Sequence, residues 1–396
     1  MDLAALYRAE YGRCVATLTR LLGDIGLAEE AVQDAFAVAV EKWETPPPNP
    51  GAWIVTTARN RAIDRLRRES TREARHAQAL LLQQPDEPAE VGPVRDDQLR
   101  MIFTCCHPAL SPLAQTALTL RLIGGLETPE IARAYLVPEA TIAQRIVRAK
   151  KKIRDAAIPY RVPEAAELPD RLPPVLTVLY LIFNEGYAAT SGPLLRTDLC
   201  REAIRLAREL ADLMPDEPEA LGLLALLVLS EARRPARVGP RGELVTLAEQ
   251  DRSLWDRQLI AEGHDLVRRC LRRNRPGPYQ LQAAINAVHT DGDATDWTQV
   301  VALYDQLLAQ TPTPIVALNR AVAVAEVHGP AAALAAVEGL ELPGYHLLPA
   351  TRADLLARLG RSTEARAAYD EAIALAGNHT ERAFLEGRRA GLDARP

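Results

Sequence analysis

Residues 128–152 of this chain read Thr128-Pro129-Glu130-Ile131-Ala132-Arg133-Ala134-Tyr135-Leu136-Val137-Pro138-Glu139-Ala140-Thr141-Ile142-Ala143-Gln144-Arg145-Ile146-Val147-Arg148-Ala149-Lys150-Lys151-Lys152. Thr128 followed by proline is typical of a helix N-cap and first helical position, and predicts a short helix that ends near Ala134. A turn over 135–137 and a second helix from Pro138 complete helix-turn-helix spacing, which places the second helix for a DNA major groove. The predicted small core consists of Ile131, Ala132, Leu136, Ile142, Ile146 and Val147.

A second basic helix lies about eighty residues upstream. It starts at Trp53 after a stiff loop, Pro46-Pro47-Pro48-Asn49-Pro50, and its pattern runs to about Arg75. Residues 59–75 hold seven arginines against three acids, and residues 145–154 hold six cations and no acid. Two cationic helices in one chain indicate a protein that binds DNA at two places.

Composition predicts an all-α protein of two or three domains. The chain has 396 residues, is 48% hydrophobic and only 5% aromatic, and is rich in Ala, Leu and Arg. The net charge of −5 hides an asymmetry, because residues 1–160 carry 21 Lys and Arg against 20 Asp and Glu. The acidic excess therefore lies in the C-terminal part.

The spacing of apolar residues and the positions of helix-breaking residues divide the chain into predicted helices, a linker and domains. Helices are predicted over 2–22, 28–43, 98–106 and from Ser111-Pro112 to Gly124-Gly125. Residues 82–93 are rich in Pro, Asp and Glu and are typical of a linker. We expect a first domain over 1–80, a linker over 81–95, a second domain over 96–160 and a helical extension over 161–396.

The cysteines and the N-terminus indicate a cytoplasmic protein. Five cysteines without framework spacing suit a reducing compartment, and no signal peptide or membrane span is expected. Cys105-Cys106-His107 is more typical of a buried helix end than of a zinc site, because adjacent cysteines do not easily ligate one ion together. We expect no catalytic residue, metal or cofactor, and hence no enzyme.

The C-terminal part contains a repeat. Ala365, Tyr369, Ala372 and Gly377 have offsets of 4, 3 and 5, and the same offsets recur from Val300 and from Ala203. The period from Val300 through Ala333 to Ala365 is close to that of tetratricopeptide repeats, which stack helix pairs into a solenoid. The pattern predicts four to six helix pairs.

Two segments depart from this repeat. The stretch 233–242 is an irregular insertion, and residues 173–196 lack the pattern. Within the latter, Phe183-Asn184-Glu185-Gly186-Tyr187 is either a functional loop between helices or a helix C-cap with Gly186 in a left-handed conformation.

In these motifs the chain resembles bacterial RNA polymerase sigma factors of the extracytoplasmic-function (ECF) type. Residues 28–36 and 51–68 resemble sigma region 2, and Leu110-Ser111-Pro112 through Lys152 resembles region 4. The tail resembles a subgroup with a C-terminal tetratricopeptide-like extension, through residues 103–108, 183–187 and 251–256. The resemblance implies core RNA polymerase and promoter DNA as partners, and an unknown protein or ligand for the extension.

The resemblance implies three sets of site residues. Polymerase binding would use Glu30, Gln33, Asp34 and Phe36. Contacts with a promoter −10 element, where one base can be unstacked, would use Asn49, Trp53, Arg59, Asn60, Arg61, Asp64, Arg65, Arg67 and Arg68. Contacts with a −35 element would use Thr128, Glu139, Ala140, Thr141, Gln144, Arg145, Arg148, Lys151 and Lys152, with Lys150 also near phosphate.

We therefore expect an alternative sigma factor that recognises −10 and −35 elements and is modulated by its helical extension. One alternative is an ordinary helix-turn-helix regulator with a repeat-type sensor domain. The other is a repeat scaffold whose N-terminal domain merely packs. The first alternative leaves the proline-rich loop and the 53–68 helix unexplained.

Overall fold

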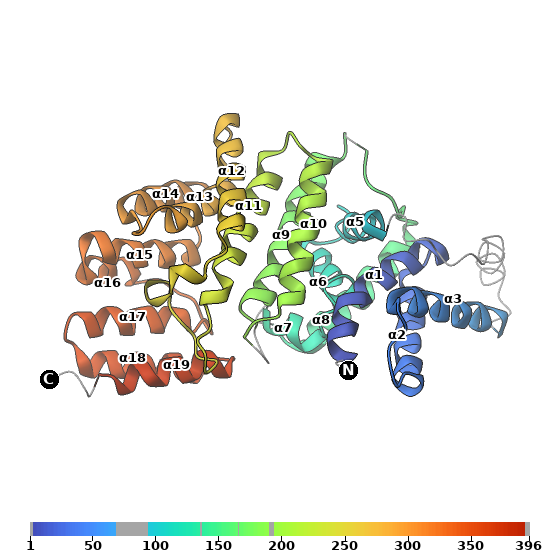
Figure 1. Ribbon diagram of the computed structural model, residues 1–396, viewed down its shortest axis with the longest axis horizontal. Helices are drawn as coiled ribbons and strands as arrows, with labels where there is room; N and C mark the ends of the chain where they lie inside the picture. Colours follow the sequence, from blue (N-terminus) through green and yellow to red (C-terminus); the bar gives the residue numbers. More distant parts are fainter. Residues whose placement is uncertain (1–2, 69–93, 135–136, 165, 190–193, 393–396) are drawn as a thin grey trace. The chain divides into compact units, whose positions relative to one another are not determined.

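The computed structural model describes residues 3–68, 94–134, 137–164, 166–189 and 194–392 (Figure 1). Within these ranges the regular structure is helical, apart from one isolated β-bridge between Val238 and Leu244. The predicted all-α class is confirmed. The predicted linker at 82–93, the end of the basic helix beyond Arg68 and the turn residue Leu136 lie outside the described residues.

The chain forms two compact units that are not simple successive segments. The first comprises residues 1–185 and 197–209, and the second comprises residues 186–196 and 210–396. Residues 161–185 and 197–209, which the repeat analysis assigns to the extension, thus pack with the N-terminal residues. The chain passes from one unit to the other three times.

The first unit is built from nine described α-helices, and the last two of them end in the second unit. They are α1 (Leu3–Leu22), α2 (Ile25–Lys42), α3 (Pro50–Arg68), α5 (Val94–Cys105), α6 (Pro112–Leu122), α7 (Thr128–Ala134), α8 (Glu139–Asp155), α9 (Leu168–Tyr187) and α10 (Thr197–Leu213).

Local signals set the ends of these helices. The Asp24 carboxylate accepts a hydrogen bond from the Leu27 backbone N–H at 2.8 Å and so starts α2. The side chain of Asn49 accepts one from the Ala52 N–H at 3.1 Å, and Pro50 is the first residue of α3. The proline-rich loop therefore ends in a capped helix.

The helix-turn-helix core is largely as predicted. Ile131 and Ile142 are completely buried, and Ala132 and Ile146 are 5% exposed. Val147 was wrongly assigned to this core, because it is 66% exposed. The buried stripe of α8 follows Ile142, Ile146, Ala149 and Ile153, and a residue next to Ile146 is rotated about 100° away from it.

Helices α9 and α10 pack on α5. The Arg171 guanidinium donates to the carbonyl of Phe103, and the Gln98 amide donates to Glu202 at 2.7 Å. Gly186 lies in the last turn of α9 with helical geometry, so both sequence interpretations of residues 183–187 are wrong. The helix continues through this segment because Phe183 is 2% exposed and anchors it in the core.

The adjacent cysteines Cys105 and Cys106 lie at a buried helix end, as predicted. Cys105 ends α5, and both thiols are buried. The Gln115 amide donates to the carbonyls of Cys106 and His107 at 3.2 and 2.8 Å, which satisfies the end of the helix. Burial raises the pKa of the Cys106 thiol to about 12, so the thiol stays neutral.

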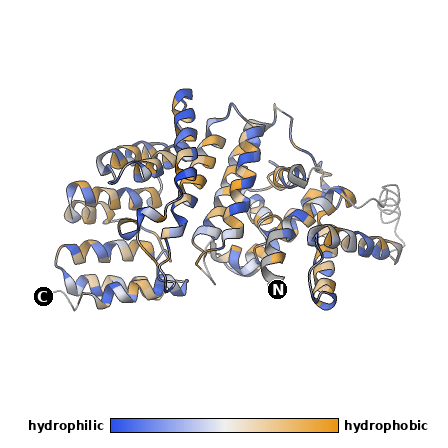
Figure 2. Ribbon diagram, in the orientation of Figure 1, coloured by the Kyte–Doolittle hydropathy of each residue, from blue (hydrophilic) through white to orange (hydrophobic). Residues whose placement is uncertain are grey.

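The second unit is a stack of helices in which each helix contacts the next (Figure 1). Polar and apolar sides alternate around these helices (Figure 2). The repeat positions Val300, Ala333 and Ala365 are fully buried, which is the close packing that the repeat predicts. The helices are α11 (Pro218–Arg233), α12 (Arg257–Arg273), α13 (Pro278–Thr290), α14 (Trp297–Gln310), α15 (Pro314–His328), α16 (Pro330–Val337), α17 (Leu347–Arg358), α18 (Ser362–Leu375) and α19 (His379–Ala390).

An insertion interrupts this stack between α11 and α12, and it extends beyond the predicted 233–242 to the start of α12 at Arg257. It contains three short 3-10 helices, η1 (Arg234–Ala236), η2 (Leu247–Glu249) and η3 (Arg252–Leu254). Trp255 is 3% exposed and packs with Ala232 and Ala236, which anchors the insertion on the end of α11.

None of the helices in the described ranges is both long enough and apolar enough to span a bilayer.

Burial of His289 makes the stability of the second unit depend on pH. Burial, followed by the positive charges of Arg233 and Arg252, lowers the pKa of His289 to about 4. The unfolded chain takes up this proton near pH 6.5 and the folded chain does not, so stability falls as the pH falls from 6.5 towards 4.

We expect His289→Asn to remove about 2 kcal/mol of the stability loss between pH 7 and pH 4.5. Denaturant unfolding at several pH values measures this, with the exposed His379→Asn as the matched control. Parallel pH profiles for wild type and His289→Asn would contradict the assignment.

Candidate nucleic-acid interface

Helix α8 presents a polar, mostly cationic face opposite its buried stripe. Thr141 and Arg145 of α8 are half-buried, and so is Thr128 at the start of α7. The apolar Val147 lies exposed among the polar residues. The fully exposed predicted residues are Glu139, Ala140, Gln144, Arg148, Lys151 and Lys152.

Helix α3 carries the other predicted surface. Asn60, Arg61 and Asp64 are exposed, whereas Arg59 and Arg65 are half-buried. Arg67 and Arg68 belong to the last turn of α3, and their side chains lie outside the described part of the structure.

Two predicted −10 residues have structural contacts at the start of α3. Asn49 caps the helix, as described above. The ring of Trp53 meets that of Trp43 edge to face, with 4.9 Å between centroids. This pair joins the end of α2 to the first turn of α3 and fixes the loop between them.

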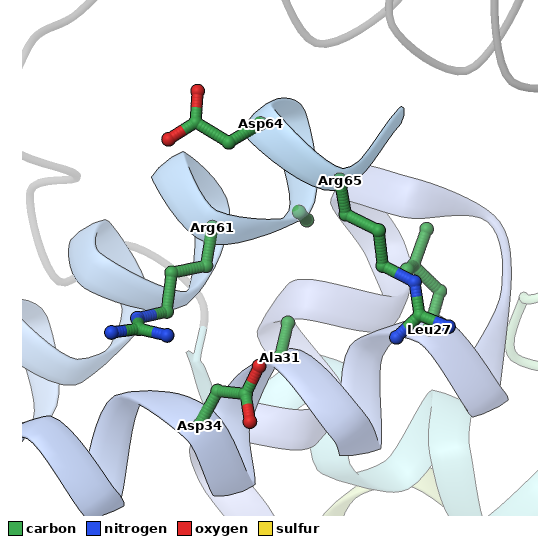
Figure 3. Close-up of a pocket in the computed structure, with 7 residues that line it drawn as sticks. Leu27, Ala31, Asp34, Arg61, Asp64 and Arg65 are labelled. Carbon is green, nitrogen blue, oxygen red and sulfur yellow. The ribbon is translucent and has the colours of Figure 1, made fainter. Parts of the chain in front are cut away.

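A groove of about 700 Å³ separates α2 from α3 (Figure 3). Arg61 and Arg65 reach from α3 toward α2, where Asp34 lies, while Asp64 points away from the groove (Figure 3). Arg65 forms an ion pair with Glu30, and both side chains are partly exposed. A predicted DNA residue and a predicted polymerase residue are thus paired with each other.

The predicted polymerase-binding residues on α2 divide into two kinds. Glu30, Gln33 and Asp34 are exposed. Phe36 is 6% exposed and packs edge to face on Tyr7, with 4.8 Å between ring centroids. Its side chain belongs to the core and positions the exposed face of α2.

A buried carboxylate joins α2 to the helix-turn-helix segment. Glu29 is 6% exposed and pairs with Arg121 of α6 at 3.2 Å and with Lys150 of α8. The hydroxyl of Tyr11 donates to it at 3.1 Å. Burial and the Glu29 charge together raise the pKa of Tyr11, so this hydroxyl remains a donor. We call Tyr11, Glu29, Arg121 and Lys150 the Glu29 cluster.

Other contacts hold the same two parts of the first unit together. The Tyr160 hydroxyl lies 2.8 Å from the carbonyl oxygen of Ala16 and 2.7 Å from that of Asp97. Arg20 pairs with the Asp97 carboxylate at 3.0 Å. Gly12 lies so close to the backbone of Ile123 that a Cβ atom there would sit 2.3 Å from its carbonyl oxygen.

The sequence analysis missed the Glu29 cluster. Glu29 is followed by a second glutamate in the sequence, but it lies on the stripe that contains Ile25, Ala28, Val32 and Phe36. A carboxylate on an apolar stripe is a signal of a buried ion pair. Its partners Arg121 and Lys150 are about 90 and 120 residues away and gave no local signal.

The described residues hold no group of His, Cys, Asp and Glu side chains arranged to bind a metal ion. The candidate site consists of three surfaces: the exposed face of α8, the cationic face of α3 and the acidic face of α2.

Three known families match consecutive parts of the chain. Sigma-70 region 2 matches residues 6–72, and sigma-70 region 4 matches residues 100–153. A family of unknown function, DUF6596, matches residues 171–271. The region 2 match begins within α1 and extends past α3, and the region 4 match covers the second half of α5 and continues into α8.

Curated relatives agree with these matches. A protein of Rhizobium meliloti (strain 1021), described as uncharacterized protein R00370, is 44% identical over 97% of this chain and 94% of its own length. The ECF RNA polymerase sigma factor SigK of Mycobacterium sp. (strain KMS) is 31% identical over 36% of this chain and 76% of its own length. SigK of Mycobacterium tuberculosis (strain ATCC 25177 / H37Ra) is 27% identical over 38% of this chain and 83% of its own length. No solved structure matches the chain.

Proposed function

Because this chain belongs to the extracytoplasmic-function (ECF) family of RNA polymerase sigma factors, we propose that it directs core RNA polymerase to promoters by contacting a −10 and a −35 element. The family consists of transcription initiation factors and not of enzymes. The observation that carries the proposal is the exposed polar face of α8, which stands on a helix-turn-helix core in the segment matched by region 4. The hypotheses of an ordinary helix-turn-helix regulator and of a repeat scaffold do not account for the match to sigma-70 region 2.

In this proposal α8 enters the major groove of the −35 element. Gln144 and Arg145 suit adenine and guanine edges, and the exposed Val147 suits a thymine methyl group. Arg148, Lys151 and Lys152 would contact phosphates and supply binding that is independent of sequence.

The region 2 surfaces would divide between DNA and polymerase. Arg59, Asn60 and Arg61 would contact the −10 strand, with Trp53 at the base-binding end of α3. Glu30, Gln33 and Asp34 would contact the polymerase. The Arg65–Glu30 ion pair lies where these two surfaces meet. On binding, Arg65 and Glu30 would either stay paired or exchange each other for DNA and polymerase, respectively.

The Glu29 cluster implies that the described conformation is a closed one. The two promoter elements lie about 25 base pairs apart, which is about 85 Å along B-form DNA. One carboxylate cannot bridge α2 and α8 while each region reads its own element. Promoter binding would therefore require the two regions to separate and Glu29 to exchange its partners.

The extension would modulate this activity by completing the polymerase-binding surface. It is covalently joined to the sigma regions, so even weak contacts act at an effective concentration near the millimolar range. Its acidic balance argues against a direct role in DNA binding.

Base readout by α8 can be tested by transcription with core polymerase on a promoter library randomised in the −35 element. We expect Gln144→Ala or Arg145→Ala to lower discrimination by about 1–3 kcal/mol at one position. Arg201→Ala, an exposed arginine of α10, is the control and should select the wild-type motif. If a variant selects the same motif as the wild type, the substituted residue does not read a base and contacts phosphate instead. Failure of the wild type to support any promoter-dependent transcription would refute the function itself.

Opening of the first unit can be tested without polymerase. Glu29→Gln leaves Arg121 and Lys150 without their carboxylate, and Gly12→Ala forces the Ile123 backbone away. Because loss of one partner of a buried pair costs about 3–5 kcal/mol, we expect Glu29→Gln to favour the open form and to bind a −35 duplex more tightly. Gly12→Ala should act in the same direction.

The controls are Glu41→Gln, an exposed carboxylate of α2, and Gly387→Ala, a helical glycine with open space around it. Fluorescence anisotropy gives the affinities, and circular dichroism establishes that each variant is folded. Folded Glu29→Gln and Gly12→Ala proteins with wild-type affinity would rule out the closed-state proposal.

Modulation by the extension can be tested by truncation after Leu213. Cutting earlier would remove α9 and α10, which pack with the sigma regions. We expect the helices of the first unit to remain folded in the truncated protein. We expect run-off transcription to decrease. Full activity would contradict modulation, and raised activity would show that the extension inhibits instead.

A further inference from the structure

A small cavity of about 200 Å³ lies in the second unit beneath the insertion between α11 and α12. Two arginines, Arg233 at the end of α11 and Arg237 just after η1, line it from one side. The remaining lining residues are Tyr187, Leu244, Val245, Thr246, Leu247 and Gln250. No carboxylate stands among these described lining residues.

Arg233 is a buried cation whose hydrogen bonds are incomplete. It is 9% exposed, and its guanidinium donates to the Asn286 amide oxygen through Nη2. Its Nη1 is buried and has no partner among the described residues. A guanidinium that is both desolvated and incompletely bonded is costly unless an anion joins it.

Arg237 offers a second incomplete guanidinium to the same cavity. Its Cζ stacks over the ring of Tyr187, 4.4 Å from the centroid, which holds the group in place. Its Nε is buried and also lacks a hydrogen-bond partner in the described part of the chain. Two fixed guanidinium groups with free N–H donors are the usual way in which proteins bind carboxylate or phosphate oxygens.

Two acidic residues near the cavity do not line it. Glu231 pairs through Oε1 with Arg234 at 2.7 Å, and its Oε2 has no hydrogen-bond partner among the described residues. Glu249 accepts from the Thr246 hydroxyl at 2.7 Å. The positive charge of Arg233 also acts on the neighbouring His289, because it helps to lower the pKa of that histidine. The fold therefore concentrates positive charge at this cavity and supplies no counter-charge from its lining.

The cavity continues into a larger groove. Thr246 and Leu247 line both, and the groove of about 1120 Å³ runs along the helices of the extension. Its walls include Trp297, Tyr304 and Phe384, which would cover an organic body. A ligand could thus place an oxyanion between the arginines and its remaining atoms in the groove.

We propose that Arg233 and Arg237 form an oxyanion-binding site through which the extension takes up a small anionic molecule, with a carboxylate or phosphate held by both guanidinium groups. Both arginines lie within the segment matched by the family of unknown function, so the site belongs to that part of the chain. The proposal concerns binding alone and is independent of the proposed promoter recognition.

Calorimetric titration of the full-length protein tests the site with inorganic phosphate and with acetate, at an ionic strength held constant with sodium chloride. Binding of phosphate alone identifies a phosphate site, and binding of acetate alone identifies a carboxylate site. We expect at least about a tenfold loss of affinity for the preferred anion in Arg237→Gln and in Arg233→Gln. Arg237 is half-buried, so its variant remains informative if Arg233→Gln fails to fold.

The matched control is Arg241→Gln, an arginine of the same insertion whose side chain is 89% exposed. It should bind the anion as the wild type does, and anion binding should raise the thermal midpoint of wild type and control but not that of Arg237→Gln. The proposal is overturned if neither anion binds beyond the effect of chloride. It is equally overturned if folded Arg237→Gln binds as tightly as wild type.

Discussion

The Glu29 carboxylate is the interaction on which the arrangement of the first unit depends. It stands among apolar residues of α2, and its charge is tolerated there because Arg121 and Lys150 reach it from α6 and α8. An uncompensated carboxylate at this depth would be strongly destabilising. The burial of one side chain therefore requires α2, α6 and α8 to stay together, although the region 2 and region 4 matches are separated by 27 residues.

This constraint has a functional cost. Lys150 belongs to the cationic stretch of α8, and its ammonium group is turned inward to Glu29. Lys152 donates to the carbonyl of Ala109 but stays exposed. Gln144, Arg148 and Lys151 remain exposed, so the closed unit keeps a partial DNA-binding face. In the closed-state proposal, an equilibrium between closed and open forms would set how much of the full face is available.

Much of this could be predicted from the sequence, because the signals were local. The Thr128-Pro129 start and the stripe of Ile142 and Ile146 each define a helix within a few residues. The repeat offsets likewise located the buried positions of the extension. The errors have a common cause: the exposure of Val147, the helical Gly186 and the burial of Glu29 depend on tertiary contacts. The division of the chain into units was equally hidden, because α9 and α10 join the first unit through contacts with α5.

The threefold passage of the chain between the units bears on how such a protein is inherited. Residues 186–196 belong to the second unit although residues 197–209 return to the first. A genetic exchange at any single point within 186–209 would leave part of one core attached to the wrong partner. An extension joined by one linker can be moved between proteins as a cassette, but this one cannot. The two units are therefore expected to pass between genomes together.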